Sequence, residues 1–182
     1  VSESENETYS AWRHPSYCFF HTAEKVLVYS YGSFMLADLT DKGLEMPDPK
    51  TESIPCGSVY DTVISADDRY IIFTVSDEMK GIKIWDIKNE TWVKIEGKQV
   101  YLSEEEICVG NESGKAAIYS TNGTIDIIDL EDGQIIQSLP CGYYGRICLA
   151  FMNHDRYLLS SGDNSILTMW DVETGEILMQ DE

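Results

Sequence analysis

Histidines and paired carboxylates are residues of this chain that could perform acid–base or metal chemistry, but their spacing argues against such a site. The three histidines, His14, His21 and His154, stand far apart, and the last two fall in segments expected to be turns between strands. The adjacent carboxylates Asp67 and Asp68 share one turn, which directs their side chains apart rather than toward one substrate. We therefore expect no catalytic residues.

The sequence also lacks the common motifs for binding nucleotides, activating nucleophiles and holding metals. No glycine-rich loop carries the lysine and hydroxyl residue that bind phosphate, and there is no Gly-x-Ser-x-Gly motif. Residues 129–133, Asp-Leu-Glu-Asp-Gly, are as acidic as a calcium loop but lack its alternating oxygen ligands and distant glutamate. They are interpreted as a hairpin turn. The expectation is a protein that is not an enzyme and has no cofactor and no metal.

The five cysteines are interpreted as structural residues. Cys18, Cys108 and Cys148 fall in the first strand of three repeated units, where small apolar residues pack, and Cys56 and Cys141 belong to a repeated Pro-Cys-Gly turn. No Cys-x-x-Cys pair is present for a metal. Five cysteines cannot all pair within one chain, which favours a reducing, cytoplasmic compartment. A minority alternative, an extracellular location, rests on four Asn-x-Ser/Thr sequons, at Asn6, Asn89, Asn111 and Asn122.

Composition and charge exclude several classes of partner. The chain has 182 residues, 32 of them acidic and 13 basic, for a net charge of −19. A field of that sign repels phosphate backbones and anionic lipid, so neither nucleic acid nor a membrane surface is expected as a partner. No apolar stretch approaches the roughly 20 residues of a membrane span, so membrane insertion is not expected either. The charge favours a basic protein partner, although acidic turns also simply keep a β-rich surface soluble.

An internal repeat sets the architecture that must position all of these residues. Trp85-Asp86, Ile128-Asp129 and Trp170-Asp171 each end a short apolar run, at spacings of 43 and 42 residues. Pro-Cys-Gly occurs at residues 55–57 and 140–142, and in both units its glycine stands 28 residues before the tryptophan. This period is typical of a repeat that builds one four-stranded blade of a β-propeller.

Each unit divides into alternating apolar runs separated by turn residues. In the two strongest units an apolar run (59–64; 147–151) precedes a polar turn (66–69; 153–156), a second run (70–73; 157–159) and the run that ends in Trp-Asp. A weaker unit lies between them, with Asn122-Gly123 as its tight hairpin turn, and a degenerate unit begins at Tyr17. Four units thus fill most of the chain, and β-strands with almost no helix are expected.

These residues resemble the WD-repeat family of β-propellers over roughly residues 17–182. The strongest piece is Ser161 to Gly175, which is close to the family's strand, turn and Trp-Asp pattern. The family usually carries Gly-His where this chain has Gly57-Ser58 and Gly142-Tyr143, which argues against the buried His, Ser/Thr, Trp and Asp hydrogen-bond network of regular blades. The resemblance implies an all-β fold of four-stranded antiparallel blades, as a partial ring of about four. Its expected divisions are an acidic segment at 1–16 and blades at about 17–55, 56–97, 98–140 and 141–182.

The resemblance also implies a face on which ligand-binding loops gather. In a propeller, the links between blades and the turns between second and third strands meet at one end. Tyrosine and arginine are frequent energetic anchors of protein interfaces. At Tyr60 packing on the neighbouring blade is the stronger alternative, and at Tyr143 and Tyr144 the two interpretations are even. The candidate protein-binding residues are Tyr60, Met79, Lys80, Tyr101, Tyr143, Tyr144 and Arg146, with Ser58 and Lys98 beside them.

Three functions are considered. The first is a non-catalytic scaffold that binds another protein, or another domain of its own chain, through that face. The second is an autoinhibitory or ligand-sensing arm of a larger assembly NTPase, because irregular acidic blades are similar to those appended to NACHT-type proteins. The third, a hydrolase or lyase propeller, needs converging histidines and carboxylates on the first strands, which instead offer Cys18, Phe19, Ile64, Cys108 and Cys148. A four-blade arc would also expose two apolar end faces and could self-associate.

Overall fold

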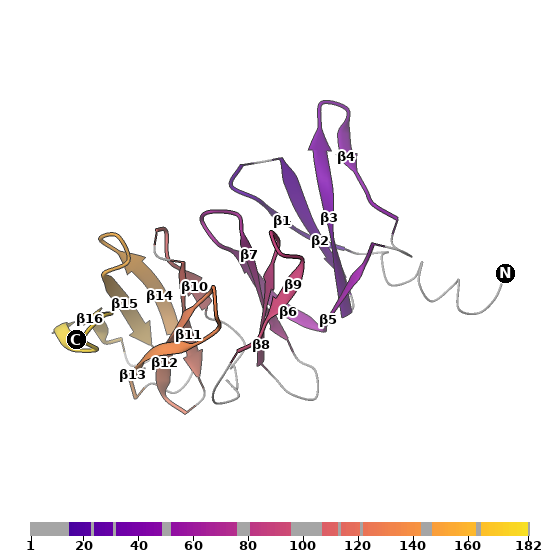
Figure 1. Cartoon of the computed structure of the whole chain (residues 1–182). Coiled ribbons are helices and arrows are strands. Elements are labelled where there is room, and N and C mark those ends of the chain that lie inside the picture. The colour runs from indigo at the N-terminus through magenta and orange to yellow at the C-terminus, as the bar shows by residue number, and fades with distance from the viewer. Residues whose placement is uncertain are drawn as a thin grey trace.

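The computed structural model describes residues 15–22, 24–30, 32–48, 52–75, 81–95, 107–112, 114–120, 122–142, 147–162 and 165–181. This part of the chain forms seventeen β-strands and no helix. The strands make four antiparallel sheets, in which neighbours along the chain are neighbours in the sheet, except for the last strand of the first sheet. Figure 1 shows the four sheets following one another in chain order. The all-β fold expected from the sequence is confirmed.

The sheets contain four strands each, except the first, which has five. The first sheet consists of β1 (Ser16–Phe19), β2 (Lys25–Ser30), β3 (Gly32–Thr40), β4 (Gly43–Glu45) and β5 (Ile54–Gly57). The second sheet consists of β6 (Val59–Ile64), β7 (Tyr70–Val75), β8 (Gly81–Asp86) and β9 (Thr91–Val93). The third consists of β10 (Ile107–Val109), β11 (Lys115–Ser120), β12 (Thr124–Asp129) and β13 (Ile135–Pro140). The fourth consists of β14 (Ile147–Met152), β15 (Tyr157–Gly162), β16 (Leu167–Asp171) and β17 (Ile177–Asp181).

The outer strand of the first sheet is divided into two pieces. β4 pairs with the far end of β3 at residues 38–40, and β5 pairs with its near end at residues 32–34. In the third sheet β13 alone covers the corresponding length of β12. The hairpin of β3 and β4 therefore extends beyond the rest of the first sheet (Figure 1). The expected turn at Pro55-Cys56-Gly57 is instead the strand β5, because this segment completes the outer edge, so the first sheet runs two residues past the expected limit at residue 55.

The sheets pack face to face because side chains alternate between two apolar faces along each central strand. In β7, Ile71 and Phe73 pack against the first sheet, whereas Tyr70 and Ile72 pack against the third. Every residue of β7 is consequently buried. We call the contacts between successive sheets the first, second and third joints.

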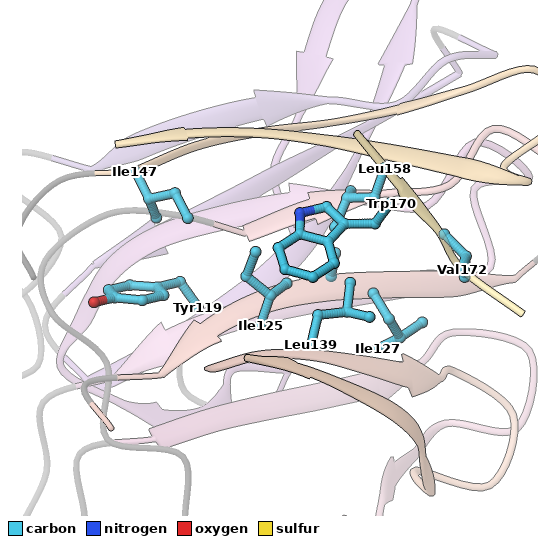
Figure 2. Packing of buried hydrophobic residues seen from close by; sticks show 9 residues of the cluster. Tyr119, Ile125, Ile127, Leu139, Ile147, Leu158, Trp170 and Val172 are labelled. Carbon is cyan, nitrogen blue, oxygen red and sulfur yellow. The ribbon is translucent and has the colours of Figure 1, made fainter. Parts of the chain in front are cut away.

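Trp170 lies at the centre of the third joint. Its side chain is 2% exposed, and Figure 2 shows it above Ile125, Ile127 and Leu139 of the third sheet. Trp85 holds the equivalent place in the first joint and is 8% exposed. Both tryptophans of the repeated Trp-Asp pairs are thus buried between sheets.

Aromatic rings fill the first joint around Trp85. The ring of Trp92 lies 5.0 Å from that of Trp85 in an edge-on arrangement, and Phe34 of β3 contacts both tryptophans at 5.6 and 6.0 Å. Phe73 completes the group, 4.9 Å from Phe34. Tilted and edge-on pairs of this kind each add roughly 0.5–1.5 kcal/mol beyond the burial of area.

A carboxylate also bridges the first joint at the end of the sheets where the first and second strands of each sheet turn. The Asp68 carboxylate, in the β6–β7 turn, accepts hydrogen bonds from the backbone amides of His21 and Thr22, both at 2.8 Å. Asp68 has a φ of 58°, in the left-handed region, which the short polar side chain of aspartate tolerates better than most. Burial alone would raise the pKa of Asp68, but these amides and the His21 side chain lower it below its ordinary value.

The third joint has the same bridge at the equivalent position. Asp155, at a φ of 59°, accepts hydrogen bonds from the backbone amides of Asn111 at 2.8 Å and Glu112 at 2.7 Å. Asp68 and Asp155 each stand two residues before the second strand of their sheet. The residue at that place in the third unit is Ser113, which lies outside the described residues. The repeated aspartate thus ties the first sheet to the second and the third to the fourth.

The two end faces of the array differ in exposure. On the fourth sheet, the apolar side chains of Met152, Leu167 and Met179 are exposed, as expected for a sheet without a following neighbour. On the first sheet the expectation holds at the two sides of the face, where Tyr17, Phe19, Leu39 and Leu44 are exposed, whereas the centre of that face is buried. The buried central residues are Val26, Val28, Met35 and Ala37.

Candidate interaction face

One of the candidate protein-binding residues lies at the end of the sheets opposite the Asp68 and Asp155 bridges. Tyr60 is the one that the structure describes, and it lies in β6, the first strand of the second sheet. The pairing of β6 with β7 shifts register between Val59 and Asp61, so Tyr60 sits at a β-bulge without a paired residue. A bulge bends the strand and redirects a side chain. The Tyr60 side chain is 53% exposed, so it does not follow the alternative of packing into a joint.

The other candidates lie outside the described residues. These are Met79, Lys80, Lys98, Tyr101, Tyr143, Tyr144 and Arg146. Ser58, which immediately follows β5, is exposed. The described surface of the face therefore centres on Tyr60 and its neighbours at the link from the first sheet to the second.

The repeated Pro-Cys-Gly motif fixes the beginning of the links on this face. In the third sheet, the backbone amides of Cys141 and Gly142 donate hydrogen bonds to the Gly123 carbonyl at 3.1 and 3.0 Å, and the Cys141 thiol donates to the same oxygen at 3.2 Å. In the first sheet, Gly57 pairs with Gly32 at the corresponding hairpin turn. The motif therefore ends the outer strand against the turn between the second and third strands, and each link leaves the sheet from a fixed point.

Cys56 and Cys18 are poor nucleophiles. Burial raises the pKa of the Cys56 thiol to about 11, against a smaller opposing effect of Lys83. Burial, followed by the negative charge of Asp61, also raises the pKa of Cys18. A thiol with a raised pKa carries little of the reactive thiolate at neutral pH. None of the five cysteines forms a disulfide, but Cys148 is exposed rather than packed, because it lies on the uncovered face of the fourth sheet.

The carboxylates of the turns are used by the backbone. Asp67 accepts hydrogen bonds from Ser65 Oγ at 2.6 Å and the Arg69 amide at 3.1 Å, whereas Asp68 reaches the first sheet. The two carboxylates therefore point apart, as the sequence suggests. In residues 129–133, Asp129 accepts a hydrogen bond from the amide of Glu131 at 2.8 Å, which closes a hairpin turn.

The aspartates of the Trp-Asp pairs act in the same way. Asp171 accepts hydrogen bonds from the amides of Glu173 and Thr174, both at 3.0 Å, and its pKa is lowered chiefly by the Thr174 amide. Asp86 lies in the equivalent turn and also binds Arg69 Nη2 at 3.0 Å. Burial would raise the pKa of Asp86, but Arg69 and the turn donors lower it. These aspartates shape turns and anchor neighbouring strands.

Sequence reasoning missed the carboxylate bridges between sheets. The signal was present in the alignment of the two strongest units, since Asp68-Arg69-Tyr70 and Asp155-Arg156-Tyr157 are the same three residues at the same place. An Asp in a turn usually binds its own backbone, so its use across a joint could not be separated from that local role without coordinates.

Comparison with protein-family models gives no match for this chain, and comparison with curated proteins gives none either. Within the described residues, there is no group of three or more histidine, cysteine or acidic side chains arranged to hold a metal ion. The same part of the chain contains no helix long and apolar enough to cross a membrane.

Proposed function

We propose that this chain is a non-catalytic protein–protein interaction scaffold, a segment of a WD-repeat β-propeller that binds a partner through the face bearing Tyr60. The observation that carries the proposal is the exposed tyrosine at a bulge, held by a sheet whose central strand β7 is buried throughout. A rigid support lowers the entropy lost when a side chain is fixed in a complex. Tyrosine then contributes a large contact area with few rotatable bonds.

The propeller part of the proposal is supported by how the sheets stack. Each inner sheet uses one apolar face for the sheet before it and the other for the sheet after it. The exposed apolar face of the fourth sheet has the character of a face that takes a further sheet. On this proposal the 182-residue chain by itself self-associates through that face, which light scattering at increasing concentration measures. A monodisperse monomer at all concentrations contradicts this part.

The surrounding charge defines the partner. The net charge of −19 favours a basic protein, or a basic domain of the same polypeptide, and disfavours nucleic acid. Five cysteines that form no disulfide suit a reducing compartment, and we place the protein in the cytoplasm as part of this proposal.

A site-specific crosslinking experiment tests the proposed face. A photoreactive phenylalanine analogue is placed at Tyr60 and, as a control, at Lys42, an exposed turn residue at the opposite end of the sheets. In cells, the Tyr60 probe is expected to form a discrete protein adduct that the Lys42 probe does not form. When the irradiation is repeated in a cell lysate, the yield of the adduct should fall as salt is added beforehand, because the attraction is electrostatic. Equal adducts from both positions contradict the proposed face.

A further inference from the structure

A cavity lies in the third joint, at the end of the sheets away from Tyr60. Its volume is ≈ 420 Å³, within the range of about 300–1,000 Å³ that small-molecule sites occupy. Lys115 and Ile136 line it from the third sheet, and His154, Asp155, Arg156, Val172 and Glu173 line it from the fourth. Three of these seven side chains carry or can carry positive charge and two are carboxylates, in a protein with a net charge of −19.

In the first joint, the lysine at the position equivalent to Lys115 is neutralised by a carboxylate. Lys25 begins the second strand of the first sheet, as Lys115 does in the third, and its ammonium binds Asp38 at 2.7 Å. Lys115 has Asp129 as its cross-strand neighbour but forms no ion pair with it. The Asp129 carboxylate instead accepts a hydrogen bond from the Glu131 amide. Within the described residues, the Lys115 ammonium therefore remains without a carboxylate.

Arg69 and Arg156, at equivalent positions of the second and fourth sheets, also differ in how closely a carboxylate binds them. In the second sheet, Arg69 binds Asp86 at 3.0 Å, and the Arg69 side chain is 28% exposed. In the fourth sheet, Arg156 lies 3.6 Å from Asp171 by its Nε atom and is 62% exposed. The Arg156 guanidinium stacks over the ring of Tyr157, 5.3 Å from its centre. Much of its hydrogen-bonding capacity is consequently available to a ligand.

His154 supplies a third cation next to these two. Its Nδ1 atom lies 2.7 and 2.8 Å from the two carboxylate oxygens of Glu112, across the joint. The hydrogen bond that the imidazole donates to Glu112, followed by the charges of Glu112 and Asp155, raises the pKa of His154 above its ordinary value. The imidazole therefore holds its proton to a higher pH than a free histidine.

The carboxylates around the cavity differ in how far other groups already bind them. Both oxygens of Asp155 accept hydrogen bonds from backbone amides of the third sheet, and Asp171 accepts hydrogen bonds from the amides of its own turn. Glu112 is bound by His154. The exposed Glu173 is then the carboxylate that lines the cavity most openly. Ile136, which is exposed, and Val172 provide apolar contact beside the charged groups.

We propose that this cavity binds a phosphoryl group carried on a small apolar body. A phosphoryl group has a charge of about −1.5 to −2 at neutral pH and three strong acceptor oxygens, which match an ammonium, a guanidinium and a protonated imidazole. Ile136 and Val172 would contact the carbon body. The carrier can be a free small molecule or a phosphorylated side chain, since the group recognised is the same. This site lies at the opposite end of the sheets from Tyr60 and does not depend on the protein-scaffold proposal.

Binding is tested by nuclear magnetic resonance titration of the 182-residue chain with phenyl phosphate and, separately, with N-acetylphosphothreonine amide. Saturable shifts are expected for the amides around residues 115, 154–156 and 173, together with a rise in the His154 titration midpoint. Saturation by phenyl phosphate alone assigns a small-molecule carrier, and saturation by the blocked phosphothreonine assigns a phosphorylated protein. The absence of saturable shifts with both probes overturns the proposal.

Three variants locate the binding energy. Lys115→Gln removes an unpaired ammonium and should weaken binding about tenfold without altering stability, since charge-assisted hydrogen bonds are the strong ones. Glu173→Gln removes a negative charge that repels the phosphoryl group, and should tighten binding by about two- to fivefold. Lys25→Gln, at the matched position in the first joint, should leave affinity unchanged. Unchanged affinity in Lys115→Gln, or equal losses in Lys115→Gln and Lys25→Gln, overturns the site.

Discussion

Trp170 donates a hydrogen bond from its indole nitrogen to the hydroxyl of Ser160, with 2.8 Å between the two atoms. Both side chains are buried, on the adjacent strands β16 and β15 of the fourth sheet. In the second sheet, Phe73 stands where Ser160 stands in the fourth, and Trp85 packs among aromatic rings. The two tryptophans of the repeated Trp-Asp pair are thus accommodated differently, one by a polar partner and the other by rings.

Replacing Ser160 with alanine should lower the free energy of unfolding by about 1–3 kcal/mol. The change leaves the indole N–H buried without an acceptor, and an unsatisfied buried donor costs the whole of its desolvation. Trp170→Ala should cost more, about 3–5 kcal/mol, as large-to-small core changes do. Urea unfolding followed by far-ultraviolet circular dichroism measures both.

Ser161→Ala is the control for Ser160, because it changes the next residue of the same strand on the other face of the sheet. Its effect on the urea midpoint should be within the small range of surface substitutions. If Ser160→Ala behaves like Ser161→Ala, the hydrogen bond does not stabilise the third joint.

Asp68 should make stability depend on pH in the acid range. Its pKa is lowered in the folded protein, so the stabilisation is complete above the unfolded value of about 3.9 and is lost as the pH falls through the lower folded value. Asp68→Asn should reduce stability at neutral pH by about 1–2 kcal/mol, because it weakens hydrogen bonds to a charged acceptor. It should also flatten the loss of stability below about pH 4.

Urea midpoints recorded from pH 7 to pH 3 test this, with Asp41→Asn in an exposed turn as the control. The control should change neither the midpoint nor its pH dependence. Parallel curves for the wild type and Asp68→Asn would show that the Asp68 carboxylate does not bridge the first joint.

Glu90 occupies a turn position at which the other sheets carry glycine. Its φ is 51°, whereas Gly133 and Gly175, at the equivalent places of the third and fourth sheets, have a φ of 74°. A non-glycine residue in the left-handed region costs about 1–2 kcal/mol. Glu90→Gly should therefore raise stability by about 0.5–1 kcal/mol after the entropy of the added glycine is subtracted. Glu90→Ala keeps the unfavourable φ and should show no gain in a thermal melt.

Much of the fold follows from the sequence because its signals are local. The runs at 59–64 and 70–73 alternate or lie between turn residues, and the structure forms β6 and β7 there. The Trp-Asp pairs also mark where β8 and β16 end. Periodicity and turn chemistry determine such elements without reference to distant residues.

Contacts between sheets were harder to predict because they depend on which distant residues meet. The sequence predicts a turn at Pro55-Cys56-Gly57, because Pro and Gly usually end strands. In the structure this segment is instead the second piece of the divided outer strand of the first sheet. The indole bond of Trp170 to Ser160 shows that part of a buried polar network exists without the Gly-His pair. For the interaction face, the sequence indicated Tyr60, but its exposure depends on a bulge that no local pattern reveals.

Gly133 and Gly175 provide a paired test of how the sheets pack. Both have a φ of 74°, so an added side chain meets the same backbone strain at either position. A Cβ atom at Gly133 would lie 2.5 Å from the backbone carbonyl oxygen of Lys94, in the segment after β9 of the second sheet. A Cβ atom at Gly175 would lie 2.6 Å from the side-chain Nε2 of Gln137 in the third sheet. Backbone cannot move aside easily, whereas a glutamine side chain can adopt another rotamer.

Gly175→Ala should accordingly cost about 1–2 kcal/mol, the strain of the left-handed conformation alone. Gly133→Ala should cost at least about 1 kcal/mol more, because the clash forces a backbone shift at the second joint. Gly32→Ala supplies the reference, since its φ is 86° and a Cβ atom there meets nothing within 4 Å. Urea midpoints should therefore fall least in Gly32→Ala and Gly175→Ala and most in Gly133→Ala. Equal losses in all three would mean that the turn at Gly133 does not press on Lys94, and the face-to-face packing of the second and third sheets would have to be revised.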